Sequence, residues 1–320
     1  MLKLSGWLAG LGGSALLLAT LCGGSSWYTP WELFGNPELH VILLLRLRRL
    51  CGAFLVGAAL ASGGTACQAV LHNDLAEPYV LGISGGAGLG AALAILCGWT
   101  QICAVALPGG AFLGAALILL IVLLPVAGQR HSGKILLSGV ITGSVCGSLL
   151  MLLISVMDNT QLNSIIWWLL GNLEARETPL LVTAGVLILA GQTVLMMLAR
   201  ATNALSVGAD FAHGFGVSPR KTVPVLLGTA ALLAAAAVSL GGVIGFVGLI
   251  GPHIARKFAG AEHSRLYWAS FWTGGVFLCL CDLAARSVIP AQELPVGVVT
   301  GLTGGPFFLY LLYRTPQKGA

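Results

Sequence analysis

Charged residues are scarce in this chain. Asp, Glu, Lys and Arg together make up 8% of its 320 residues, against roughly 25% in an average soluble domain. Hydrophobic residues make up 57% of the sequence, and the mean hydropathy is +0.93. This balance excludes a soluble enzyme, because most of the chain has to lie in lipid. We therefore expect an all-α polytopic membrane protein that forms one domain over residues 1–320, surrounded by membrane lipid.

Sequence patterns for catalysis, metal binding and nucleic-acid binding are also missing. The Lys and Arg residues form no run that could follow a phosphate backbone, and the eight Cys residues include no CxxC pair. Residues 128–134 have the glycine spacing of a nucleotide-binding P-loop, but Ile135 stands where a Ser or Thr has to reach magnesium. We therefore expect no catalytic residue, no metal site and no bound cofactor in this chain, and no nucleic-acid partner.

Apolar runs long enough to cross a membrane, about 17–25 residues each, follow one another along the sequence. They lie at 6–24, 50–71, 80–98, 102–128, 135–157, 180–198, 266–285 and 294–312. We interpret the first run as an uncleaved span, because Leu21 before Cys22 does not suit a lipoprotein cleavage site. The segment 223–254 is too long for one span, and two spans with a tight turn near 239–243 satisfy the positive-inside rule better. The sequence therefore predicts ten transmembrane helices with both termini in the cytoplasm.

Ionisable residues are almost absent from these runs, and Asp282 is the exception. Arg286 follows four residues later, so both side chains share one helix face and we expect them to pair. Ion-coupled carriers need buried carboxylates and often contain an internal repeat. Asp282 is the one carboxylate within these runs, and no internal repeat is visible. No loop is long enough to hold a soluble domain. The sequence thus favours a route for a bulky solute, with the energy supplied by partner proteins, over an ion-coupled carrier or a channel-like scaffold.

Arginines gather at the predicted outer mouth of the second span, against the positive-inside trend. Arg46 and Arg49 lie three residues apart on one helix face, and Arg286 is also predicted to lie outside. Guanidinium groups suit carboxylates on a partner protein, but they also suit lipid headgroups. The residues alone leave both interpretations open.

Two predicted cytoplasmic connections have a possible function. Residues 72–78 join two spans, and the GxxxG-spaced Gly86 and Gly90 behind them allow another helix to approach closely. This segment is either a packing turn or a gate. The connection 200–222 has breaks at Gly208 and Gly216, and it holds four apolar residues that could form one face: Leu205 before the first break, and Phe211, Ala212 and Phe215 between the two. We expect one or two short helices here, whose apolar face docks on another protein rather than in the membrane interface.

Six segments carry a resemblance to a known family. They are 45–49 (LRLRR), 57–61 (GAALA), 73–78 (NDLAEP), 81–87 (LGISGGA), 242–256 (GVIGFVGLIGPHIAR) and 293–300 (ELPVGVVT). Together they resemble the FecCD-type permeases of ATP-binding-cassette (ABC) importers for iron-siderophores, haem and cobalamin. The resemblance implies a type II ABC importer permease: a homodimer of ten-helix subunits with the translocation path between the copies. It also implies two cytoplasmic ATPase subunits that bind ATP and Mg, and a periplasmic or lipid-anchored substrate-binding protein.

The resemblance also assigns roles by position. Arg46 and Arg286 match arginines that pair with the binding protein, and we add Arg49, which shares the face of Arg46. The cytoplasmic gate is matched by Asn73, Leu75, Ser132 and Gly133. Coupling helices that sit in the ATPase are matched by 205–216, and the residues assigned to this role are Leu205, Gly208, Asp210, Phe211, Ala212, Phe215 and Gly216.

Three positions depart from the family pattern. Arg48 and Asp74 stand where the family usually has proline, and Ala209 stands where an acidic residue is common, with Asp210 one place late. These differences affect the predicted docking mouth, the gate turn and the coupling helix. We expect the permease of an importer for an iron chelate, either a ferric siderophore or haem, in the bacterial inner membrane. Cobalamin is the alternative substrate, because the sequence does not identify the chelate.

Overall fold

The structure, a computed structural model, describes residues 20, 23, 28–36, 39–123, 132–174, 177–289 and 292–314. This part of the chain is helical and contains no strand. The helices are α2 (Pro30–Gly35), α3 (His40–Leu71), η2 (Pro78–Leu81), α4 (Ile83–Leu96), α5 (Trp99–Ile102), α6 (Ala106–Leu123), α7 (Ser132–Ser155), α8 (Asn159–Leu169), α9 (Thr178–Met197), α10 (Ala199–Val207), α11 (Ala209–Gly214), α12 (Pro219–Gly241), α13 (Val247–Ala259), α14 (His263–Ser287) and α15 (Val296–Arg314). Each predicted span after the first overlaps one of these helices, while the first, 6–24, lies outside the described residues apart from 20 and 23.

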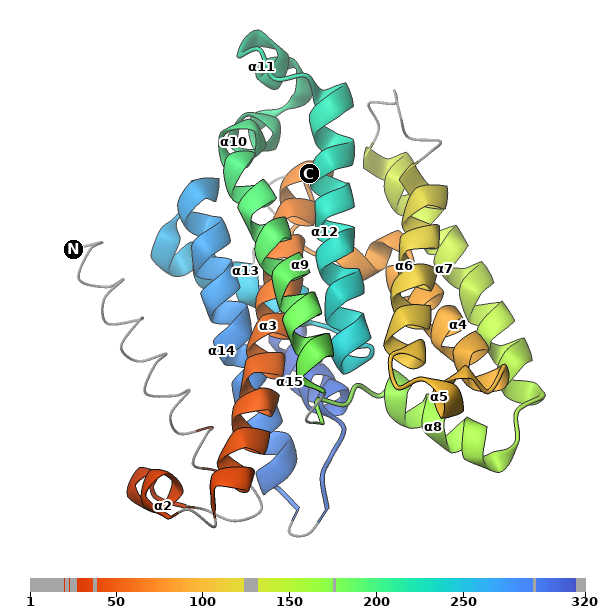
Figure 1. Cartoon of the computed structure of the whole chain (residues 1–320). Coiled ribbons are helices and arrows are strands. Elements are labelled where there is room, and N and C mark those ends of the chain that lie inside the picture. The colour runs from red at the N-terminus through yellow and green to blue at the C-terminus, as the bar shows by residue number, and fades with distance from the viewer. Residues whose placement is uncertain are drawn as a thin grey trace.

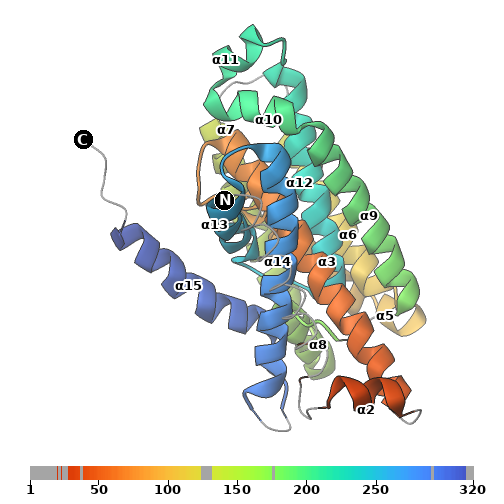
Figure 2. The same ribbon diagram turned by 90° about the vertical axis from the view of Figure 1, so that its left-hand side faces the viewer.

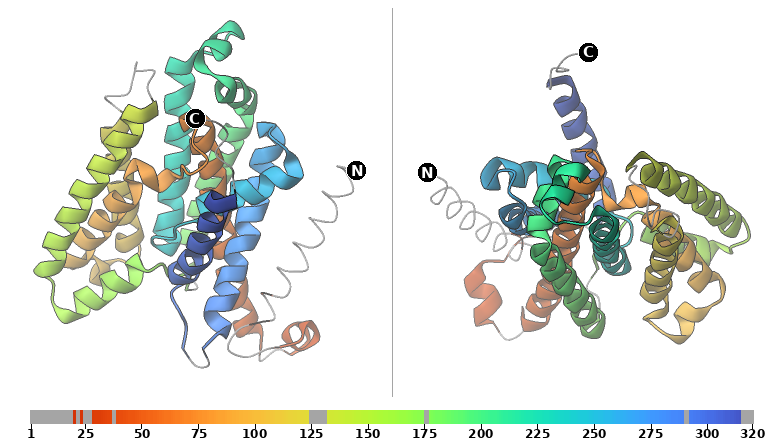
Figure 3. Two further views of the ribbon diagram at one scale, coloured as in Figure 1. Left: turned by 180° about the vertical axis from the view of Figure 1, so that it is seen from behind. Right: turned by 90° about the horizontal axis from the view of Figure 1, so that it is seen from above.

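The helices form two groups around the long helix α3. One group packs α9, α12, α13 and α14 against α3, and the other contains α4, α6, α7 and α8 (Figures 1 and 3). Helices α10 and α11 lie at one end of the bundle, and α2, α5 and α8 lie at the opposite end. Helix α15 starts beside α14 and then leans away from the bundle (Figure 2). The predicted functional segments therefore lie at two opposite ends of the molecule.

Five helical segments are long and apolar enough to cross a membrane. They are Ala106–Leu123, Gly133–Ser155, Thr178–Met197, Pro219–Gly241 and His263–Ser287. Helix α4 has 14 residues and α13 has 13, so at 1.5 Å per residue each rises only about 20 Å of the roughly 30 Å hydrocarbon core. The prediction of an all-α membrane protein is confirmed, and the number of ten crossings stays a prediction.

The segment 223–254 contains two helices, as expected, but the turn between them lies later than predicted. Helix α12 continues through Gly241, so the predicted turn residues 239–241 are helical. Gly242 has φ 71° and ψ −160°, a backbone conformation that is essentially restricted to glycine, and the helix ends there. The turn therefore spans 242–246, and α13 begins at Val247.

Glycines let the helices touch backbone to backbone. A Cβ at Gly90 of α4 would collide with the carbonyl group of Gly110 in α6, and one at Gly114 would collide with the carbonyl group of Gly86. The predicted close approach at the GxxxG pair is thus confirmed, with α6 as the partner helix. Helix α3 makes the same kind of contact, and its glycine pairs with α13 and α14 are Gly64 with Gly248 and Gly57 with Gly274.

Replacing Gly90 tests this packing. We expect Gly90→Ala to destabilise the protein by about 1–3 kcal/mol, because the new methyl group forces α4 away from α6. Gly109→Ala is the matched control on α6, since no atom lies within 4 Å of the Cβ position there. Thermal unfolding of the purified protein in detergent measures both, and equal midpoints for the two variants would contradict the close approach.

Candidate functional site

The turn 72–77 connects α3 to η2 and is shaped by Asn73. The Asn73 side-chain oxygen accepts a hydrogen bond from the Leu75 N–H at 2.9 Å, and its carbonyl oxygen accepts one from the Ala76 N–H at 3.0 Å. Asn side chains commonly fix such turns by bonding to the backbone two residues on. Ala76 is buried beneath the turn, and Leu75 is exposed at its tip. Asn73 therefore positions Leu75, the other predicted gate residue in this turn.

The turn is attached to α13 at two points. Asp74 Oδ1 lies 2.6 Å from Arg256 Nη1, and the Phe246 N–H at the start of α13 donates to the Glu77 carboxylate. Gly248 leaves room for this approach, because a Cβ there would lie 3.2 Å from the Cβ of Glu77. Asp74, which replaces the proline of the family pattern, thus forms an ion pair that the family residue lacks. No local pattern predicts this pair, since its partners are 182 residues apart.

The other two predicted gate residues, Ser132 and Gly133, begin α7. Gly133 is exposed, and no atom lies within 4 Å of its Cβ position, while the side chain of Ser132 lies outside the described residues. Helix α7 packs on η2, where a Cβ at Gly139 would meet the backbone of Val80 and Leu81. Both parts of the predicted gate are thus joined through η2, and their role as a gate stays a prediction.

The predicted coupling segment forms two short helices, as expected. Helix α10 ends at Val207, and α11 follows from Ala209 to Gly214. Gly208 separates the two helices with a non-helical backbone conformation, φ 154° and ψ 155°. Gly216 then takes a left-handed conformation with φ 76°. Asp210 lies in the first turn of α11 and is exposed. The glycine breaks therefore produce an elbow at the end of the bundle, visible at the top of Figure 1.

The expectation of one common apolar face on this elbow is wrong. Leu205 and Ala212 are buried at 3% and 0% exposure and pack inside the chain. Phe211 and Phe215 are 47% and 71% exposed, with ring centroids 4.6 Å apart. The packing of α10 against α3 and α14 turns Leu205 inward. Apolar surface for a partner is therefore offered by the phenylalanine pair, Phe211 and Phe215, and not by the whole set.

At the opposite end, Asp282 of α14 holds a cluster of charges. Its two carboxylate oxygens lie 2.9 Å from Arg49 Nε and 3.0 Å from Arg286 Nε. Arg49 also pairs with Glu293 at 2.8 Å, and Arg286 donates to the carbonyl oxygens of residues 20 and 23 at 3.2 Å. The predicted Asp282–Arg286 pair is confirmed. Sequence reasoning missed Arg49 as a partner of Asp282, because 233 residues separate them.

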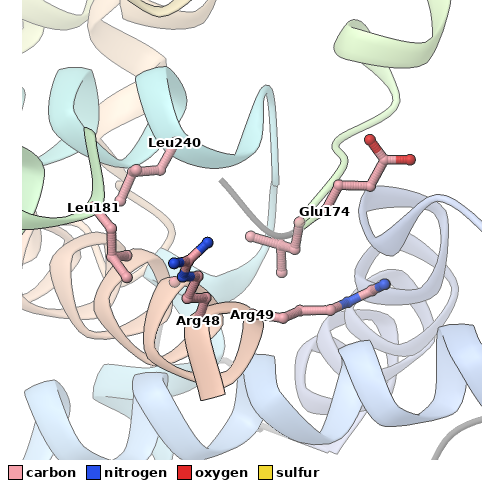
Figure 4. A pocket seen from close by; sticks show the side chains of 7 residues that line it. Arg48, Arg49, Glu174, Leu181 and Leu240 are labelled. Atoms are coloured by element: carbon pink, nitrogen blue, oxygen red, sulfur yellow. The ribbon is translucent and has the colours of Figure 1, made fainter. Parts of the chain in front are cut away.

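The three arginines of the predicted docking mouth therefore differ in their surroundings. Arg49 and Arg286 hold Asp282 within the chain, whereas the Arg46 guanidinium lies 5.1 Å from the ring centroid of Tyr28. Docking of a binding protein on these residues stays a prediction. In Figure 4, Arg48 points toward Leu181 and Leu240, whereas Arg49 extends to one side, away from them. The residues that line this pocket are Arg48, Arg49, Gly52, Leu173, Glu174, Leu181 and Leu240.

The charge cluster predicts a large stability effect at Asp282. Asp282→Asn leaves two poorly exposed guanidinium groups without their shared carboxylate, so we expect a loss of about 3–5 kcal/mol in unfolding free energy. Glu293→Gln removes an exposed partner of Arg49, and we expect a change below about 1 kcal/mol. Thermal unfolding in detergent compares the two, and a midpoint for Asp282→Asn equal to that of the wild type would remove the structural role.

Glu77 predicts a pH dependence of stability. Burial raises the pKa of Glu77 from 4.5 to about 7, and the hydrogen bond from the Phe246 N–H opposes part of this rise. Between these two pH values the folded protein binds more protons here than the unfolded chain, so stability falls as the pH rises. Glu77→Gln does not ionise. We expect the thermal unfolding midpoint of Glu77→Gln minus that of the wild type to be larger at pH 8 than at pH 5. An equal difference at the two pH values would contradict the raised pKa of Glu77.

Comparison with known proteins identifies the family to which this chain belongs. Residues 13–314 match the FecCD transport family. The hemin transport system permease protein HmuU of Yersinia pestis is 36% identical over 321 residues, which cover 96% of this chain and 96% of that protein. The vitamin B12 import system permease protein BtuC of Escherichia coli O157:H7 is 34% identical over 301 residues, covering 93% of this chain and 91% of that protein.

A solved structure shares the fold. It is an ABC transporter in an inward-facing conformation, and it matches with a TM-score of 0.84 and 30% sequence identity. The match covers 95% of this chain and 98% of that chain. These relatives are transport permeases, which confirms the prediction that the chain is a permease and not an enzyme. The chain belongs to the FecCD transport family and is the integral-membrane permease of an ABC transporter.

Proposed function

We propose that this chain is the membrane subunit of a binding-protein-dependent ABC importer for an iron chelate, either a ferric siderophore or haem, in the bacterial inner membrane. Cobalamin is an equal alternative, because relatives of similar identity are named for hemin and for vitamin B12 transport. The observation that carries the proposal is the α10–α11 elbow, which exposes Phe211 and Phe215 at the end of the bundle. Exposed aromatic side chains of this kind suit contact with a partner protein.

The proposed assembly contains two copies of the chain, with the translocation path between them. Two cytoplasmic ATPase subunits bind ATP and Mg and dock on α11, and a periplasmic or lipid-anchored binding protein delivers the substrate at the opposite end. Ten crossings with both termini in the cytoplasm agree with the distribution of Lys and Arg over the predicted loops. In this proposal ATP and Mg belong to the ATPase subunits, and the chain itself needs no cofactor.

An ion-coupled carrier is the weaker alternative. Such a carrier needs a carboxylate in the membrane that takes up and releases a proton or an ion. Asp282, the acidic residue of α14, is instead held by guanidinium groups at 2.9 and 3.0 Å.

In the proposed importer, closure of the ATPases around ATP would bring the two elbows together and move the predicted gates, 72–77 and 132–133, in alternation.

Uptake into proteoliposomes tests the proposal. The liposomes hold the chain with its cognate ATPase and binding protein, and ferric siderophore, haem and cobalamin are offered in parallel. We expect accumulation of one of the three, dependent on ATP and on the binding protein. ATP hydrolysis that ignores the binding protein, without accumulation of any substrate, would contradict the importer function.

The same assay locates the ATPase contact. Phe211→Asp combined with Phe215→Asp places two charges on the exposed pair, and we expect uptake to fall at least about ten-fold, since aromatic anchors dominate protein interfaces. Phe258→Asp is the matched control, because this exposed phenylalanine lies on α13 and outside the elbow. Equal uptake by the double variant and the control would remove α11 from the ATPase contact.

A further inference from the structure

The turn 72–77 is joined directly to the elbow. The ring nitrogen Nε2 of His72 lies 3.0 Å from the backbone carbonyl oxygen of Leu205 in α10. A carbonyl oxygen can only accept a hydrogen bond, so Nε2 carries the proton and donates. Leu205 lies in the last turn of α10, where carbonyl groups lack partners within the helix. His72 therefore supplies a partner for the end of the predicted coupling helix.

The backbone of His72 is held in an uncommon conformation. His72 ends α3 with φ 50° and ψ 38°, and in the described part of the chain Phe246 is the one other residue besides glycine with positive φ. Left-handed conformations of such residues are strained and persist where the surroundings fix them. The His72 N–H donates to the Gln68 carbonyl oxygen. His72 is thus fixed to α3 by its backbone and to α10 by its side chain.

The neighbouring contacts set the direction in which a movement can pass. Asn203 of α10 accepts hydrogen bonds from the backbone N–H and the ring of His263, at 2.8 and 2.7 Å, which fixes α10 to the start of α14. On the other side of the turn, Asp74 pairs with Arg256 of α13. Asn73 lies between these two attachments and is adjacent in sequence to both His72 and Asp74. A displacement of α10 can therefore be passed to Asn73 through the side chain of His72.

We propose that His72 is a positioning residue that couples the α10–α11 elbow to the gate turn through the hydrogen bond from its Nε2 to the Leu205 carbonyl oxygen. The inference rests on the proposed function, because it takes the elbow as the ATPase contact and the turn as the gate. When the ATPases move the elbow, the bond transfers that displacement to Asn73 and Leu75. Without the bond, ATP hydrolysis continues, but fewer hydrolysis events lead to movement of the gate.

Two amide substitutions separate this role from a merely structural one. In His72→Gln the side-chain nitrogen stands close to the place of Nε2, so the bond to Leu205 can form. In His72→Asn the nitrogen stands close to the place of Nδ1 and is too short to reach, while asparagine tolerates the left-handed backbone well. His40→Asn is the control, because this exposed histidine lies at the opposite end of the same helix.

The measured quantity is substrate imported per ATP hydrolysed, in proteoliposomes with the cognate ATPase and binding protein. We expect His72→Asn to keep its basal ATP hydrolysis and to lower this ratio about five-fold, the effect of losing one ordinary hydrogen bond. His72→Gln should keep most of the wild-type ratio, and His40→Asn should keep all of it. Thermal unfolding checks that every variant folds as the wild type does.

Two results would overturn the inference alone. One is that His72→Asn imports as much substrate per ATP hydrolysed as the wild type. The other is that His72→Gln imports as little substrate per ATP as His72→Asn. Wild-type protein that hydrolyses ATP and imports none of the three substrates would instead contradict the proposed function, and the role of His72 with it. Import by the wild type is therefore measured first in each preparation.

Discussion

Contact between glycine backbones on α3 and those on α13 and α14 is the constraint on which both ends of the molecule depend. Lipid supplies no hydrophobic drive between helices, so close packing of this kind holds a membrane bundle together. The contacts bring α13 and α14 against α3. They thereby place Arg256 beside the turn 72–77 and Asp282 beside Arg49. The ion pairs at the two ends are consequences of the same packing.

The two ends use charge differently. At one end, Asp282 is almost fully buried and shared by two arginines, so its charge serves the fold. At the other end, Asp74 is exposed and its bond with Arg256 is open to water, where ion pairs are weak and readily broken. A weak attachment of this kind resists movement of the turn 72–77 less than a buried ion pair would. The departure from proline at Asp74 fits this pattern.

Local sequence patterns predicted local structure. The apolar runs gave the helices because length and hydropathy decide a span, and the four-residue spacing of Asp282 and Arg286 gave their pair. The pairs Arg49–Asp282 and Asp74–Arg256 were not predictable, because only the packing of distant helices brings them together. The burial of Leu205 follows from the position of α10 against α3, which its own sequence does not specify. The turn begins at Gly242, inside the predicted 239–243, but it continues to Phe246, because hydropathy is continuous across this segment and does not mark the helix ends.

Where two helices touch at a pair of glycines, no side chain separates their backbones. In α3, α13 and α14, a displacement of one helix cannot be absorbed by rotamer changes at these contacts, because a glycine has no rotamers. We therefore expect these three helices to move together. Any bending is then expected in the connections beside them, at 72–77 and 242–246, and not within the three helices.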